Sequence, residues 1–411
     1  MPSIGIVGAG ISGLHLALRL RQRGLPTTVY TDRLPEEVAA GRLENGVIRF
    51  ASTLARERAL GVDHWNQPEY GWYGARLTSA GELPLDFIGR AEQPGQGVDF
   101  RLYLPRLMRD LTERGGVLKR MPLDIESILR LETRHDLVVV ASGGRSAGEL
   151  FPRDPDRSPF TSPQRRLCLG LYAGIEPMAE GVMLFQACPG IGEIFSGRFL
   201  HPEGLAHSIM IEAIPGGPLE HLTRLSYVDD RAAFRRELLT ILAEHAPGLR
   251  ERVSERDFDV VRPTDLLQGG ITPTVRRGWA RLPGGRYALA LGDAWVTNDP
   301  IVAQGANFGS RCAFVLADAI MAGPPFDEAF CRAVELEMWQ VGRPATEWSN
   351  AFLGPPQPHL IDLLIAANTD QRVADAYLTN FNDPFKQWEI LSTPESTSAW
   401  LKGFARESAD A

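Results

Sequence analysis

Residues 4–13 of the chain read Ile4-Gly5-Ile6-Val7-Gly8-Ala9-Gly10-Ile11-Ser12-Gly13, an apolar run that leads into a glycine-rich turn. Leucine and alanine residues at helical spacing follow, so the pattern predicts a strand, a tight turn and a helix. Gly8 would permit the turn, Gly10 would let the backbone approach a pyrophosphate, and Gly13 would let the helix pack on the strand. Free N–H groups at the helix start favour a diphosphate, so this stretch predicts a dinucleotide site.

A second predicted strand, Thr27–Thr31, follows this helix and is succeeded by an acid, Asp32. Asp32 lies about twenty residues beyond the last glycine, where an acidic side chain holds a ribose hydroxyl in such sites. A lone Gly-x-Gly-x-x-Gly is weak support, but strand, helix, second strand and acid occur here in the required order. The alternative is a glycine-rich loop in a sheet that binds no nucleotide.

Composition bounds the class of protein. The 411 residues are 44% hydrophobic and 23% charged, and the formal net charge is −8, which argues against general nucleic-acid binding. The four cysteines show no C-x-x-C spacing, and neither a secretory leader nor an apolar run long enough to span a bilayer is seen. We therefore expect a soluble cytoplasmic protein without disulfides, a metal site, a membrane span or a nucleic-acid partner.

The chain reads as a nucleotide-binding domain interrupted by an inserted sheet. Leu137–Ala141 is a continuous apolar run, typical of a strand buried on both faces of a parallel sheet. Short strands separated by glycine and proline turns then predict an antiparallel sheet, and a predicted helix over 232–246 covers it. These strands are expected at 166–172, 182–185, 193–195 and 208–211.

The expected boundaries follow from these patterns. The nucleotide-binding domain would comprise residues 1–164 and 271–325, the substrate-binding sheet residues 165–270, and a helical C-terminal region residues 326–411. The stretch 46–98 reads as mixed, with turn signals at Gln67-Pro68 and Pro94-Gly95. The predicted fold class is thus α/β, with a Rossmann-like domain, an inserted antiparallel sheet and a helical end.

A second motif appears near residue 300, in the sequence Gly292-Asp293-Ala294-Trp295-Val296-Thr297-Asn298-Asp299-Pro300-Ile301-Val302-Ala303-Gln304-Gly305-Ala306-Asn307. Asp293 directly follows a predicted buried strand. A proline-bearing loop then leads into a glycine turn at the start of a predicted helix. The acid can accept from a sugar-alcohol hydroxyl, and the N–H groups of the turn can face an electron-rich ring edge. Together with the N-terminal motif, this sequence strongly indicates a dinucleotide-binding site.

With both motifs in place, the chain resembles the FAD-dependent aromatic hydroxylases, and more closely the oxygenase component of two-component styrene and indole monooxygenases. The resemblance runs almost from end to end. It is carried by Gly8-Ala9-Gly10-x-x-Gly13-Leu14-His15-Leu16, Val29–Arg33, Arg42-Leu43-x-Asn45, Val98–Tyr103 with Pro105, Leu266–Gly270, Asp299-Pro300, Gln304–Asn307, Asn380–Asn382 and Gln387-Trp388.

The resemblance implies FAD as cofactor and assigns its contacts. It leaves open which side chain at the end of the second strand binds the ribose, and surface arginines are the alternative for Arg42 and Arg101. The implied cofactor-binding residues are Gly8, Gly10, Gly13, Thr31, Asp32, Arg33, Arg42, Arg101, Gly143, Asp293, Pro300, Gln304, Gly305, Ala306 and Asn307.

The resemblance also implies the reaction. FADH2 would arrive from a separate NADH-dependent flavin reductase, and dioxygen would form a C4a-hydroperoxide that epoxidises or hydroxylates an aromatic alkene such as styrene or indole. Asn45 would lie near the reacting flavin face, with turn capping as its alternative role, and Pro300 would wall the ring. No triad is needed, so His15 and the other histidines are interpreted as structural or exposed. A homodimer is implied by the family alone.

Tyr73, Arg76, Trp295 and Ile301 are the expected substrate contacts. Arg76, together with Arg49, departs from the family pattern, and an arginine facing the pocket would suit an anionic or polar substrate such as a carboxylated indole. The alternative is that both arginines point to solvent.

Other functions remain possible from the sequence. A single-component hydroxylase would reduce its own FAD with NAD(P)H, but Ser142-Gly143 stands where its Asp-Gly signature would be expected. A halogenase would need a Trp-x-Trp motif and a suitably placed lysine, and the sequence has no such motif. A flavin-dependent dehydrogenase or reductase, and a non-catalytic FAD-binding protein, are the remaining alternatives.

Overall fold

The computed structural model describes residues 1–81, 83–178 and 181–410. Its first layer is a six-stranded sheet in the order β15-β16-β7-β1-β2-β6, in which every pairing is parallel except β15 with β16. The strands are β1 (Ile4–Val7), β2 (Thr27–Thr31), β6 (Val117–Arg120), β7 (Leu137–Val140), β15 (Trp279–Arg281) and β16 (Tyr287–Ala290). The predicted α/β class and the buried strand near 137–141 are confirmed.

The opening turn has the geometry that its glycines predict. Gly8 has φ +110°, a conformation that side chains with a Cβ rarely adopt. At Gly13, inside α1 (Ile11–Gln22), an added Cβ would lie 2.1 Å from the carbonyl oxygen of Gly8. Helix and strand therefore pack as closely as they do only because both positions are glycine.

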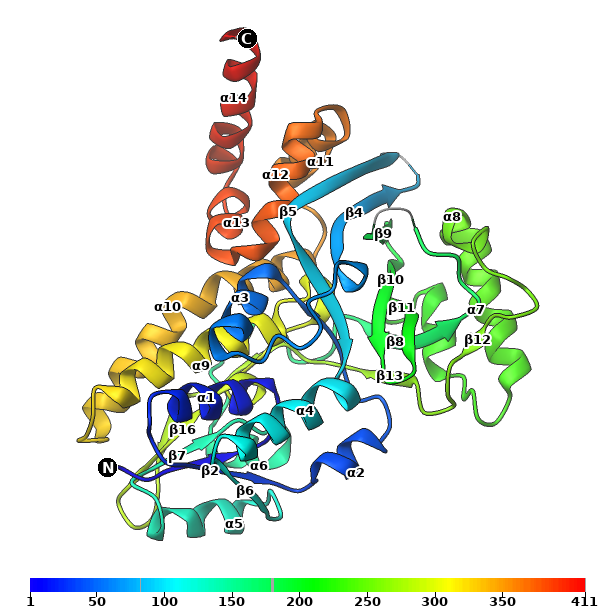
Figure 1. Cartoon of the computed structure of the whole chain (residues 1–411). Coiled ribbons are helices and arrows are strands. Elements are labelled where there is room, and N and C mark those ends of the chain that lie inside the picture. The colour runs from blue at the N-terminus through cyan, green and yellow to red at the C-terminus, as the bar shows by residue number, and fades with distance from the viewer. Residues whose placement is uncertain (82, 179–180, 411) are drawn as a thin grey trace.

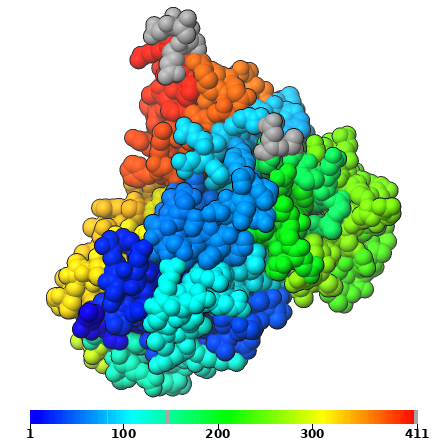
Figure 2. All heavy atoms as spheres, viewed as in Figure 1, coloured from blue at the N-terminus to red at the C-terminus, as the bar shows by residue number. Residues whose placement is uncertain are grey.

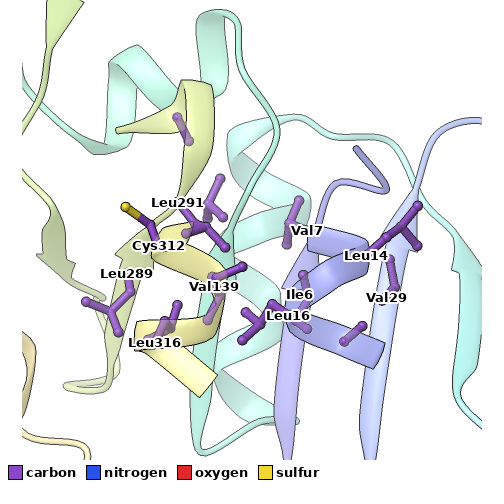
Figure 3. Packing of buried hydrophobic residues seen from close by; sticks show 14 of the residues in the cluster. Ile6, Val7, Leu14, Leu16, Val29, Val139, Leu289, Leu291, Cys312 and Leu316 are labelled. Carbon is purple, nitrogen blue, oxygen red and sulfur yellow. The ribbon is translucent and has the colours of Figure 1, made fainter. Parts of the chain in front are cut away.

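The core of this layer lies between the sheet and two helices, α1 and α9 (Gly305–Met321) (Figure 3). Ile6, Val139 and Leu289 from the strands, with Leu16 and Leu316 from the helices, are fully buried. Each such side chain contributes about 1.5–3 kcal/mol by leaving water. Because β16 and α9 come from late in the sequence, this core is shared between the two ends of the chain.

The second layer is a nine-stranded sheet in the order β12-β8-β11-β10-β9-β4-β5-β3, with β13 paired to β8. The predicted strands appear in it. Its strands are β3 (Gly46–Arg49), β4 (Trp72–Ser79), β5 (Leu85–Asp99), β8 (Arg166–Ala173), β9 (Val182–Cys188), β10 (Gly192–His201), β11 (Gly204–Ala213), β12 (Asp259–Val260) and β13 (Leu266–Gly270).

This sheet is not confined to the segment expected to form it. The neighbours β4 and β9 pair in parallel across more than a hundred residues of sequence, and β3 and β5 continue the sheet from there. Three strands from the first hundred residues therefore extend the sheet toward the nucleotide-binding layer.

The turn signal at Pro94-Gly95 lies within β5 and marks an irregularity in that strand. Gly95 pairs with Trp72, whereas the next pair joins Arg90 to Gly74, so the intervening residues of β5 bulge outward. Proline has no N–H to donate to a neighbouring strand, and a bulge tolerates it. The turn signal reports this bulge within one long strand.

Helices cover the outer side of the second sheet. The predicted helix over 232–246 is α7 (Arg231–His245), and the short α8 (Pro247–Arg250) follows it. Phe234, Leu238 and Leu242 of α7 are buried in a cluster with side chains of β8 and β11. In Figure 1 the strands β8, β11 and β12 of this sheet, with α7 and α8, form the right-hand part of the molecule, and β4 and β5 lie nearer its centre.

The C-terminal region is helical, as predicted. It comprises α10 (Glu328–Phe352), α11 (Pro358–Thr369), α12 (Gln371–Thr379), α13 (Pro384–Leu391) and α14 (Pro394–Asp410). Helix α12 packs on β5, and α10 packs on α9, so this region contacts both layers. In Figure 2 the blue residues of the first hundred lie between the yellow residues of α9 and the green residues of the second sheet.

The remaining elements connect these layers. They are α2 (Pro35–Ala39), α3 (Ala51–Leu60), α4 (Phe100–Glu113), α5 (Ile125–Arg130), α6 (Arg145–Leu150), β14 (Thr274–Val275) and β17 (Val296–Thr297). Among the helices that the structure describes, none has the length and apolar character needed to cross a bilayer.

Candidate active site

Two helix N-termini meet at the carboxyl edge of the first sheet. Ser12 and His15 of α1 contact Gly309 and Ser310 of α9, so the two helices begin at the same end of the layer. Neither α1 nor α9 has a side-chain cap hydrogen bond. Their first N–H groups are therefore available to an anion, and the two positive dipole ends act together.

The backbone at this edge borders open space. A Cβ added at Gly10 or at Gly305 would meet no atom within 4 Å, and one at Gly143 would meet only Asp293, at 3.3 Å. Gly143 follows β7 and Asp293 follows β16, which are neighbouring parallel strands. The edge is thus lined by glycine backbone and one acid, as a bound dinucleotide requires.

Asp293 occupies a distinctive environment. Its side chain is accessible to solvent, yet burial raises the pKa of its carboxyl, and the positive charge of Arg276 opposes that rise. The carboxyl is accessible at the carboxyl edge of the first sheet, beside Gly143. In that position it can accept a hydrogen bond from a polyol hydroxyl.

The three candidate ribose contacts at the end of β2 differ in their partners within the protein. Thr31 is buried, and its hydroxyl is bonded to the backbone N–H and carbonyl of Arg33. Arg33 forms a two-point ion pair with Glu44, at 2.6 and 3.0 Å. Asp32 is exposed, and its carboxylate accepts no hydrogen bond from any described residue, although its charge acts on the neighbouring Arg33. The carboxylate of Asp32 is therefore the acceptor left free.

The two arginines that are candidates for binding the diphosphate also differ in whether they have partners within the protein. Arg101 is buried, and its Nη2 lies 2.5 Å from Asp99 and 2.6 Å from Asp265. Two internal carboxylates already neutralise this guanidinium, which disfavours a diphosphate contact. Arg42 is exposed, and no ion pair is recorded for it among the described residues.

The loop between β17 and α9 is held rigidly. Asp299 caps the short 3-10 helix Pro300–Val302 by accepting from the Ile301 N–H at 3.1 Å. Ala303 then adopts a left-handed conformation, φ 52°. Gln304 donates to the carbonyl of Phe381 at 2.9 Å, which fixes the end of the loop to the C-terminal region.

Asn307 connects this loop to the second sheet. Its Oδ1 accepts from the Phe50 N–H at 2.9 Å and the Thr53 hydroxyl at 2.7 Å. Its Nδ2 donates to the carbonyls of Ile48 and Ala303 at 2.8 and 2.9 Å. The side chains of Gln304 and Asn307 are thus bonded within the protein, and the backbone N–H groups of Gly305 and Ala306 lie in the uncapped first turn of α9.

Asn45 directly precedes β3 of the second sheet. It is exposed, and its neighbour Gly46 packs so closely on β8 that an added Cβ would lie 2.3 Å from Leu169. Within the described chain the Asn45 amide has no recorded partner, so the turn-capping role finds no support there.

The expected substrate contacts are not brought together. Ile301 is buried in an apolar cluster with Leu77 and Phe87 of the second sheet. Trp295 is fully buried in the core of the first layer, against Phe308 and Trp339, which disfavours a substrate contact. Tyr73 is partly exposed and donates to the Pro68 carbonyl at 3.3 Å.

The two unusual arginines have internal partners. Arg76 remains 38% exposed and forms a two-point bond with Asp86, with both distances at 2.7 Å. Arg49 is buried, bonded to Glu57 and Gln96, and stacked on the ring of Tyr103. Neither arginine offers an unpaired charge to an anionic substrate, and Arg49 does not point to solvent.

A buried polar chain that the sequence analysis missed lies behind the loop. The Tyr103 hydroxyl donates to Glu57 at 2.7 Å and lies 2.8 Å from Nε2 of His15, whose Nδ1 lies 2.9 Å from the Ser310 hydroxyl. Burial, and then the charges of Arg56 and Arg49, lower the pKa of His15 to about 3, so it is neutral. His15 is structural, as expected, but no spacing in the sequence links it to its partners.

A metal site has no support in the described residues, because no group of three His, Cys, Asp or Glu side chains could hold an ion. Their four cysteines are buried and free.

Comparison with solved structures defines the class of fold. The chain aligns along its whole length with a triple mutant of the flavin-dependent brominase Bmp2, covering 100% of both chains, with a TM-score of 0.70 and 14% identity. A flavoprotein/dehydrogenase from Cytophaga hutchinsonii gives 0.68 with 13% identity over 99% of both chains. Pseudomonas aeruginosa PqsL in complex with 2-aminobenzoylacetate gives 0.63 with 16% identity, over 95% of this chain and 100% of that one. The fold is that of the aromatic hydroxylase-like flavoproteins.

Sequence comparison defines the family. Residues 143–252 match the family described as "Styrene monooxygenase A putative substrate binding domain". Styrene monooxygenase StyA of Pseudomonas fluorescens is 37% identical over 406 residues, 98% of each chain, and StyA of a Pseudomonas species gives the same values. The chain therefore belongs to the styrene monooxygenase family. It is a FAD-dependent monooxygenase that uses reduced flavin, which a flavin reductase supplies.

Proposed function

We propose that this chain is an oxygenase that epoxidises a small, apolar aromatic alkene, with styrene and indole as candidate substrates. The observation that carries the proposal is the match to StyA along 98% of both chains, which includes the glycine turn, the loop near residue 300 and the second sheet. Styrene is the substrate in the name of that relative, and indole follows from the resemblance in the sequence.

The residues at the carboxyl edge of the first sheet fit FAD. The N–H groups at the starts of α1 and α9, beside Gly10 and Gly305, would bind the diphosphate and the ring edge. Asp32 would accept from the ribose, Asp293 from the ribityl chain, and Arg42 would balance the diphosphate charge. Reduced FAD, when bound, supplies the electrons that activate dioxygen.

The protein's part in the reaction is to exclude water and to position the alkene. Ile301 and Leu77, with the partly buried Phe185 and Phe195, form an apolar cluster between the loop and the second sheet, beside acidic side chains of β10 and β11. Because Arg49 and Arg76 are neutralised by Glu57 and Asp86, this region favours a neutral substrate over a carboxylated one. Asn45 and Pro300 would lie on the flavin side of that region.

The remaining proposals concern partners and location. Contact with the reductase is expected to be transient, and a homodimer is expected from the family. Free, buried cysteines support a location in the reducing cytoplasm.

Oxygen transfer tests this function directly. The protein is mixed with FAD, NADH, dioxygen and an unrelated NADH:FAD reductase, with styrene and indole in parallel reactions. Styrene oxide, or coloured products of indole oxidation, should form only when both proteins are present. Reductase alone and the Gly10→Ala variant are the controls.

Two outcomes would contradict the proposal. If NAD(P)H alone bleached FAD bound to this chain, a single-component hydroxylase or a dehydrogenase would be favoured. If a carboxylated indole were oxidised and both neutral substrates were not, the assignment of an apolar substrate would be wrong.

A further inference from the structure

Two carboxyl groups meet inside the protein, between the second sheet and the loop near residue 300. Glu212 lies on β11, and Asp299 immediately precedes the 3-10 helix Pro300–Val302. Both residues are 0% exposed. Their side chains are within hydrogen-bonding reach of each other.

Protein donors leave most of these carboxyl oxygens unbonded. Asp299 Oδ1 accepts from the Ile301 N–H, but Asp299 Oδ2 and both oxygens of Glu212 receive no donor from any described residue. Two ionised carboxylates can only accept hydrogen bonds, so their contact requires a proton between them. A buried carboxylate without a donor would otherwise lose several kcal/mol of solvation.

The surrounding charges do not supply a substitute for that proton. Glu193 lies directly opposite Glu212 on β10, and Arg165 holds Glu193 with two bonds of 2.7 and 2.9 Å. The charges of Arg165 and Glu193 act on both carboxyls. The three acids Glu193, Glu212 and Asp299 therefore share one guanidinium. From α10, the uncharged Ser349 donates to the Asp299 carbonyl at 3.0 Å.

We propose that Glu212 and Asp299 share a single proton, and that the resulting hydrogen bond positions the 299–304 loop against the substrate sheet. Both are positioning residues, since neither is placed on the cofactor or the substrate. The inference rests on the proposed function, because this loop carries Pro300 and leads into the candidate flavin contacts of α9.

Loss of the shared proton should lower the stability of the folded protein. Burial and the neighbouring Asp299 charge raise the pKa of Glu212 well above its ordinary value, and burial likewise raises the pKa of Asp299. The folded protein then binds more protons than the unfolded chain above pH 4.5, so this pair's contribution to stability falls as the pH rises. At alkaline pH two buried negative charges would repel each other across the loop.

Infrared spectroscopy tests the shared proton without any cofactor. Wild type should show the carbonyl band of one protonated, buried carboxylic acid at neutral pH. Glu212→Gln and Asp299→Asn should each abolish that whole band, because the remaining carboxylate is ionised and accepts from the new amide. Asp86→Asn should leave it unchanged, since Arg76 lowers the pKa of Asp86. Absence of the band in wild type, or loss of half of it in each variant, would overturn the shared proton.

FAD affinity tests the positioning role. The affinity of wild type should weaken at alkaline pH, whereas Glu212→Gln, which keeps a donor at every pH, should show a flat profile. Glu212→Leu should weaken FAD binding roughly ten- to hundred-fold at all pH values, because it cannot hydrogen-bond Asp299. Identical pH profiles for wild type and Glu212→Gln would refute the role of the pair. A chain that bound no FAD would refute the proposed function while the infrared result still stood.

Discussion

The glycines of the opening turn differ in what a methyl group would touch. In Gly13→Ala the new carbon would lie 2.1 Å from the Gly8 oxygen, so overpacking should lower the free energy of unfolding by about 1–3 kcal/mol. In Gly10→Ala it would meet nothing within 4 Å, so stability should stay near that of wild type while FAD affinity falls. Urea unfolding without cofactor and a FAD fluorescence titration measure the two effects. Equal stability of the two variants would contradict the assignment.

Asp32 is the free acceptor at the end of β2, and its removal should affect the cofactor alone. Asp32→Ala should weaken FAD binding by about tenfold or more, since a charge-assisted hydrogen bond is lost. Thr31→Ala should instead destabilise the turn after β2, because the Thr31 hydroxyl is bonded to Arg33. If Thr31→Ala had the larger effect on FAD affinity at unchanged stability, Thr31 would be the ribose contact.

His15 gives the protein a pH-dependent stability of known sign. Its pKa is about 3 in the folded protein against an ordinary 6.5, so below pH 6.5 the unfolded chain binds a proton that the folded chain does not. Stability from this residue is therefore complete above pH 6.5 and falls as the pH drops, by up to about 1.4 kcal/mol per pH unit. The pKa of buried Glu57 is raised and gives the opposite slope, so wild type must be compared with His15→Gln. Urea unfolding of both proteins from pH 6.5 down to about 5 measures this effect. As the pH falls, the free energy of unfolding of wild type should decrease relative to that of His15→Gln with that slope.

At the scale of single residues, the sequence predicts backbone roles better than side-chain partners. Gly8 and Gly13 are required by a local turn, so a short motif specifies them. The neutralisation of Arg76 by Asp86 depends on how β4 pairs with β5, and that of Arg49 depends on how α3 packs. Tertiary pairings of this kind leave no pattern in a single sequence.

At the scale of elements, one amide holds the start of α9, the loop before it and β3 together. Asn307→Ala removes four hydrogen bonds and leaves the Phe50 N–H without its acceptor, so it should lower the free energy of unfolding by roughly 2–4 kcal/mol. Differential scanning calorimetry measures the loss.

Two variants sharpen that test. Asn307→Asp keeps the acceptor for Phe50 but places an oxygen against the carbonyls of Ile48 and Ala303, so it should also destabilise the protein. Asn45→Ala, on an exposed amide, is the matched control and should not change stability. Wild-type stability of Asn307→Asp would mean that these two carbonyl contacts contribute little.

The β4–β5 hairpin shows why some elements were not predicted. Its residues contain glycine, glutamine and proline, and the strand β5 is interrupted by a bulge, so no regular alternation marks it. Its place in the sheet is set by parallel pairing of β4 with the distant β9, which no local signal records. By contrast β8 to β11, each bounded by turn residues, were predicted from local pattern.

At the scale of the whole molecule, FAD should stabilise both ends of the cofactor layer together. Ligand at 100 times its dissociation constant adds about 2.7 kcal/mol to the folded state. Amide hydrogen exchange in β1 and in β16 should therefore slow in parallel on adding FAD, by up to about a hundredfold, while α7 on the second sheet responds less. Protection restricted to β1 and α1 would mean that residues after 270 do not belong to the FAD site.

The strand order of the parallel sheet also determines when its strands can pair during protein synthesis. Strand β7 ends at Val140, but its partner β16 begins only at Tyr287, after all of the second sheet. At about 5–20 residues per second, a ribosome needs roughly 7–30 s to make the intervening chain. During that time the nascent protein presents an unpaired, wholly apolar strand edge, Leu137–Val140, so we expect chaperones to hold this edge until the late strand emerges.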